Sequence, residues 1–129
     1  MAGLILDSMG TIKMQVLEKA MTDLHRINGL VEQMAANAKQ GKPSASIMAS
    51  IKRYLTTMAA QLKSQFGMIS DAVTNVYISS SRGSSDQARA RVLKEGIAAV
   101  KQALEIGITQ TKQKHAVHRE KAEPSASPE

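Results

Sequence analysis

The chain contains no cysteine and no tryptophan among its 129 residues, and its only aromatic residues are Tyr54, Phe66 and Tyr77. Without cysteine it has no disulfide, no thiolate nucleophile and no cysteine ligand for a metal. This absence leaves the redox compartment undecided. Because aromatic side chains are so few, we expect a core built from aliphatic residues and from some of the eight methionines.

Long hydrophobic runs are missing as well. No stretch approaches the ~20 apolar residues that a membrane-spanning helix needs. The apolar run at residues 4–6 is too short for the core of a cleaved signal peptide. We therefore expect a cytoplasmic protein with no transmembrane segment, although secretion without a cleaved signal leaves no such trace in a sequence.

Acidic residues are scarce in the middle of the chain, where Asp71 is the single carboxylate between Glu32 and Asp86. The formal net charge is +6 and the isoelectric point is about 9.8. A positive balance of this size favours an anionic partner, but it also keeps an apolar helical protein soluble.

Two groups of helix-breaking residues divide the chain. Gly41 is suited to end a helix in the left-handed conformation, and Pro43 is suited to open the next one. Gly83 can close a helix, and Ser84 with Gln87 has the spacing of a capping box. These signals predict three helices, over residues 2–40, 44–80 and 84–121.

Within each segment apolar residues recur in alternating steps of three and four, as on one face of a helix. This pattern predicts a single all-α domain over residues 1–122, an antiparallel, coiled-coil-like three-helix bundle, followed by a disordered tail over 123–129. One alternative is a four-helix bundle, because Asn28-Gly29 favours a turn that would split the first helix.

Glycines inside the predicted helices require an explanation, since each costs about 1 kcal/mol relative to alanine. In an antiparallel hairpin that turns near residue 83, Gly67 and Gly96 lie at similar heights. We therefore predict a close helix crossing at these two glycines.

The first and third predicted helices carry more apolar surface than one core seam accounts for. Ile106, for example, lies nearly opposite the seam of its own helix. An apolar band that the bundle leaves uncovered predicts a homo-oligomer or a helical protein partner. The predicted self-association residues are Ile5, Met9, Ile12, Val16, Ile27, Leu30, Met34, Val92, Ile106 and Val117.

Lysines at helical spacing suggest a second function. Lys52 and Lys63 share one helix face, and Lys94, Lys101 and Lys112 share another. Such faces suit a basic helical module that binds an anionic partner, either a nucleic acid backbone without sequence preference, a membrane surface or an acidic protein. The scarcity of aromatics opposes base stacking, and the lack of tryptophan opposes membrane-surface contact.

Catalytic chemistry is not indicated by any residue pattern. The three histidines are His25, His115 and His118. Of these, His115 and His118 could share a helix face with Glu120 or Glu123 nearby, but two histidines at a helix end are a weak metal signal. We therefore predict no enzymatic activity, no metal and no cofactor, and a structural protein that self-assembles through helix-helix packing.

Overall fold

The structure, a computed structural model, describes residues 5–83 and 85–117. These residues form four helices, α1 (Ser8–Lys39), α2 (Ala45–Leu62), α3 (Gly67–Ser81) and α4 (Asp86–His115). Short strands β1 (Ile5–Leu6) and β2 (Ala116–Val117) pair antiparallel and join the two ends of this part of the chain. The predicted all-helical class is confirmed, whereas the predicted tail over 123–129 lies outside the described residues.

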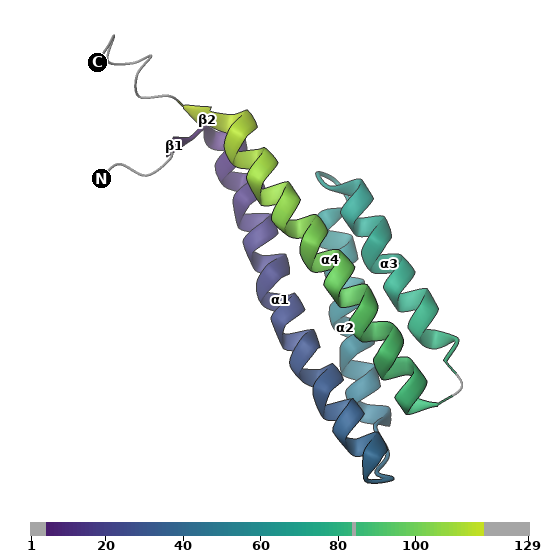
Figure 1. The fold of residues 1–129 in the computed structure, drawn as a ribbon. Coiled ribbons are helices and arrows are strands. Elements are labelled where there is room, and N and C mark those ends of the chain that lie inside the picture. The colour runs from purple at the N-terminus through teal and green to yellow at the C-terminus, as the bar shows by residue number, and fades with distance from the viewer. Residues whose placement is uncertain (1–4, 84, 118–129) are drawn as a thin grey trace.

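The helices run alternately up and down in an antiparallel bundle (Figure 1). α1 packs against α2 and α4, and α3 packs against the same two helices, so α2 and α4 are diagonally opposed. The predicted number of three helices is wrong. The four-helix alternative placed the extra break at Asn28-Gly29, but α1 runs through that dipeptide without interruption.

The extra break lies at residues 63–66, inside the helix predicted over 44–80. The buried residues on either side of it, Leu62 and Ile69, are seven residues apart, a spacing that equally suits one continuous helix. Because α3 folds back at this turn, Ile69 lies beside Gly107 and Val76 lies beside Gly96 of α4.

Local signals at the helix ends explain the other two turns. Gly41 has a φ of 70°, and the amides of Gly41 and Lys42 donate to the carbonyls of Ala38 and Asn37, which is a Schellman motif. At the next turn Ser85 caps α4 by accepting from the amide of Ala88. The predicted cap, Ser84, lies outside the described residues.

The core is aliphatic, as expected from the composition. Its largest fully buried side chains are Leu17, Leu24, Ile27, Val31, Met34, Ile51, Leu55, Met58, Leu62, Val73, Leu93 and Leu104. The predicted close crossing occurs at Gly96, where an added Cβ would lie 2.6 Å from Val76 Cγ2. Gly67 has no neighbour within 4 Å of such a Cβ, so it takes no part in that crossing.

The helices differ in length, and this difference shapes one end of the molecule. α1 and α4 have 32 and 30 residues, whereas α2 and α3 have 18 and 15. Gly107 marks the level where α3 begins, because a Cβ there would lie 3.4 Å from side-chain atoms of both Leu17 and Ile69. Residues 8–16 and 108–115 extend beyond this level by about 13 Å at 1.5 Å per residue. They run alongside and then past the α2–α3 turn, where Phe66 shares a groove with Gln110 (Figure 1). We call these two stretches the overhang.

Candidate self-association surface

A polar cluster holds the two helices together at the tip of the overhang. The amide of Gly10 donates to Asp7 Oδ1 at 2.7 Å, which caps α1. His115 Nδ1 of α4 lies 3.2 Å from the same carboxylate, and Lys13 Nζ lies 3.3 Å from His115 Nε2. The hydrogen bond from Gly10, followed by the contacts with His115, holds the pKa of Asp7 below its ordinary value of 3.8.

The backbones also approach closely at this tip. The amide of Asp7 donates to the carbonyl of His115 at 3.0 Å. A Cβ on Gly10 would lie 2.5 Å from His115 Cβ, so only glycine fits at that position without a shift. Together with the β1–β2 pair, these contacts join the two helices of the overhang at their ends.

Exposed apolar side chains concentrate at this end of the molecule. Met9 and Ile12 of the overhang are 49% and 48% exposed, Ile106 at its base is 50% exposed, and Met68 on the first turn of α3 is 88% exposed. Ile78, at 40%, is the one other large apolar side chain so exposed among the described residues. Because isolated exposed apolar residues carry little meaning, it is their clustering that marks a surface.

The apolar residues of α1 lie on the side that α2 covers further down the bundle. Lys19, Asp23 and Arg26 line a groove between α1 and α2. Ile12 and Val16 precede Lys19 and Asp23 by seven residues, so they lie on the same side of the helix. On this side of the overhang no described helix takes the place of α2.

A corresponding arrangement exists on α4. Ala99 lines the groove between α3 and α4, and Ile106 follows it by seven residues. Ile106 also lines an apolar groove of about 430 Å³ with Phe66 from the α2–α3 turn and Met68 from α3. We call the combined surface the overhang face. Its members are Met9, Ile12, Val16, Phe66, Met68 and Ile106.

Two residues predicted for self-association belong instead to the core of the monomer. Ile27 and Met34 are both 0% exposed, so neither is available to a second copy. The buried stripe of α1 includes them because α1 contacts two neighbours, and the residues just beyond it, Met21 and Ala35, are only half-buried.

The other predicted residues divide between the overhang and the body. Met9, Ile12, Val16 and Ile106 belong to the overhang face. Leu30 and Val92 are half-buried in the four-helix part. Ile5 and Val117 are backbone partners in the β1–β2 pair. Phe66 and Met68 are not predicted for this surface from the sequence, because the apolar spacing places both inside a continuous helix.

The predicted basic residues do not form one surface. Lys94, Lys101 and Lys112 are exposed on α4, whereas Lys52 lies on α2 and Lys63 directly follows it. Since α2 and α4 are diagonally opposed, the two sets of lysines lie on different sides of the bundle. A flat anionic surface would therefore meet one set at a time.

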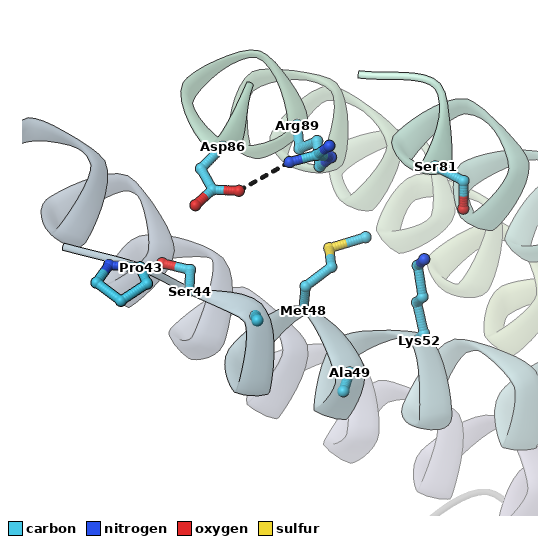
Figure 2. Close-up of a pocket in the computed structure, with 9 residues that line it drawn as sticks. Pro43, Ser44, Met48, Ala49, Lys52, Ser81, Asp86 and Arg89 are labelled. Carbon is cyan, nitrogen blue, oxygen red and sulfur yellow. Dashed lines mark hydrogen bonds and ion pairs between the residues drawn. The ribbon is translucent and has the colours of Figure 1, made fainter. Parts of the chain in front are cut away.

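Lys52 lines a pocket of about 450 Å³ at the end of the molecule opposite the overhang. Figure 2 shows Lys52 and Met48 projecting from α2 into this pocket. Lys52 Nζ lies 5.9 Å from the centre of the Tyr77 ring, and Arg89 pairs with Asp86 at 2.8 Å. Both cations are thus engaged within the chain, which weakens this pocket as a site for an anion.

Metal binding finds no support in the described part of the chain, where no three histidine or acidic residues are grouped to hold an ion. His118, Glu120 and Glu123 lie outside that part. None of the helices within residues 5–83 and 85–117 is both long and apolar enough to cross a membrane.

Comparisons of the chain with protein-family models, with curated proteins and with solved structures give no match. The function is therefore inferred from the residues of this chain alone.

Proposed function

We propose that this protein is a non-enzymatic structural protein that self-associates through helix-helix packing of its overhang face. One observation carries the proposal. Among the described residues, four of the five exposed large apolar side chains, all but Ile78, gather at the end of the molecule where α1 and α4 project past α2 and α3. Packing a second copy over these side chains removes apolar surface from water, which stabilises the associated state by about 25 cal/mol for each Å² buried.

Light scattering on the full chain over a range of micromolar concentrations tests the proposal. We expect the mean mass to rise from 13.9 kDa toward at least twice that value as the concentration increases. A mass that stays at 13.9 kDa at every concentration would refute it.

A basic module for an anionic partner is the second candidate, and the exposed Lys94, Lys101 and Lys112 of α4 support it. The two candidates respond oppositely to salt. Binding to nucleic acid or to anionic vesicles weakens as salt rises, because it depends on released counterions. Apolar association between copies of a chain with a net charge of +6 strengthens, because salt screens their repulsion.

A further inference from the structure

We infer that two copies of this chain pair through their overhangs in an antiparallel, two-fold arrangement, so that each overhang supplies the two helices that the other lacks. This inference rests on the proposed self-association and specifies its geometry. It predicts a continuous four-helix column, with the body of one copy at each end.

Steric exclusion by the α2–α3 hairpin sets the direction of pairing. The hairpin occupies the side of α1 and α4 directly below the overhang face. A second copy lying parallel to the first would place its own hairpin or helices in that occupied space. When the second copy is reversed, its overhang enters the open side and its body extends past the tip of the first copy. A two-fold axis across the middle of the overhang generates this arrangement.

The lengths of the two overhang helices suit such pairing. Residues 8–16 of α1 and 108–115 of α4 project by nearly the same amount, so both partner helices can pair along their whole projecting length. In this arrangement α1 packs against α1 of the partner copy, in the place that α2 takes within one copy. Likewise α4 packs against α4 of the partner copy, in the place that α3 takes within one copy. The groove at Phe66, Met68 and Ile106 then receives the tip of the second copy.

The helix dipoles are also matched in this arrangement. The carboxyl end of α2, at Leu62, points toward the amino end of the partner's α1, so a negative end meets a positive one. The amino end of α3, whose cap residue Phe66 makes no side-chain hydrogen bond, points toward the carboxyl end of the partner's α4. Lys112 and Lys114 in the last turn of α4 oppose this attraction, and salt screens both the attraction and the repulsion.

Cross-linking through single cysteines tests the geometry, and the absence of native cysteine makes each introduced thiol unique. Ile12 lies midway along residues 8–16 on the overhang face. In the Ile12→Cys variant the thiols of the two copies should therefore lie close together across the two-fold axis. A short bis-maleimide should therefore give a covalent dimer. Gln15→Cys, at a similar height in an exposed line with Thr22 and Gly29, is the matched control and should give little dimer.

A second reporter leaves the apolar side chains of the overhang face intact. Gln110 is exposed, lines the groove beside Ile106, and lies near the middle of the α4 overhang. Gln110→Cys should cross-link as Ile12→Cys does, with Thr109→Cys on the exposed side of α4 as its control.

Light scattering of the same variants distinguishes the proposed self-association from the proposed antiparallel pairing. If the variants associate and both reporters cross-link well above their controls, the antiparallel pairing is supported. Association without preferential cross-linking at residues 12 and 110 would overturn the antiparallel pairing and leave self-association standing. Monomers at every concentration, for the native chain as well, would overturn both.

Discussion

Glycine-to-alanine substitution should stabilise the protein at position 29 but not at position 96, although both glycines lie inside helices. At Gly29 an added Cβ has no neighbour within 4 Å, so the substitution brings only the helix-propensity gain of about 1 kcal/mol. At Gly96 the same Cβ would lie 2.6 Å and 3.0 Å from the two methyl carbons of Val76. Valine is stiff about χ1, so it cannot easily turn away.

The expected size of the effect at Gly96 follows from these two opposing contributions. Overpacking a well-packed contact costs about 1–3 kcal/mol, and the propensity gain returns about 1 kcal/mol. Gly96→Ala should therefore be neutral to about 2 kcal/mol destabilising, whereas Gly29→Ala should stabilise by about 1 kcal/mol. In thermal melts each kcal/mol corresponds to roughly 4 °C for a domain of this size.

A double-mutant cycle identifies the contact itself. Val76→Ala makes room for the new methyl group, so it should cost less in the Gly96→Ala background than in the native chain. Equal stabilisation by Gly29→Ala and Gly96→Ala, with no coupling to Val76, would show that α3 does not pack closely on α4 at this point. The four-helix arrangement would then be wrong there.

Two further predictions concern the core and the tip of the overhang. Ile27→Ala should destabilise the monomer by about 2–5 kcal/mol in urea unfolding, while Ile12→Ala should change it by less than about 1 kcal/mol in dilute solution, and equal losses would contradict the assignment of Ile27 to the core. Because the pKa of Asp7 is lowered by folding, its carboxylate contributes stability above its ordinary pKa of 3.8, and this stability is lost as the pH falls through the lower folded value. Asp7→Asn keeps a good helix cap, so it should flatten the pH dependence of the urea midpoint in this acid range without removing the cap. An unchanged pH profile would show that the Asp7 carboxylate is not held by Gly10 and His115.

Much of the fold could be predicted from the sequence because its signals are local. The apolar repeat predicts the helices, and Gly41 predicts the end of the first one, where its positive φ is observed. The turn at residues 63–66 could not be predicted in this way. The repeat from Leu62 to Ile69 keeps the same period whether the helix continues or folds back, and only packing against α4 distinguishes the two.

The same turn explains why the candidate surface was predicted only in part. Met9, Ile12 and Ile106 stand out from the sequence as apolar residues beyond a core seam. The overhang itself depends on α2 and α3 being shorter than α1 and α4, and therefore on the unpredicted break. Ile27 and Met34 are predicted for the self-association surface but lie in the core, because the position of the buried stripe on α1 depends on which helices flank it.

Sedimentation equilibrium on two variants tests whether this chain associates through its overhang face. The double variant Met68→Gln, Ile106→Gln removes two large apolar side chains from the overhang face, whereas Ile78→Gln removes one that is 40% exposed elsewhere on α3. We expect the double variant to remain near 13.9 kDa at concentrations where the native chain and Ile78→Gln associate. Association of the double variant as strong as that of the native chain would contradict this expectation.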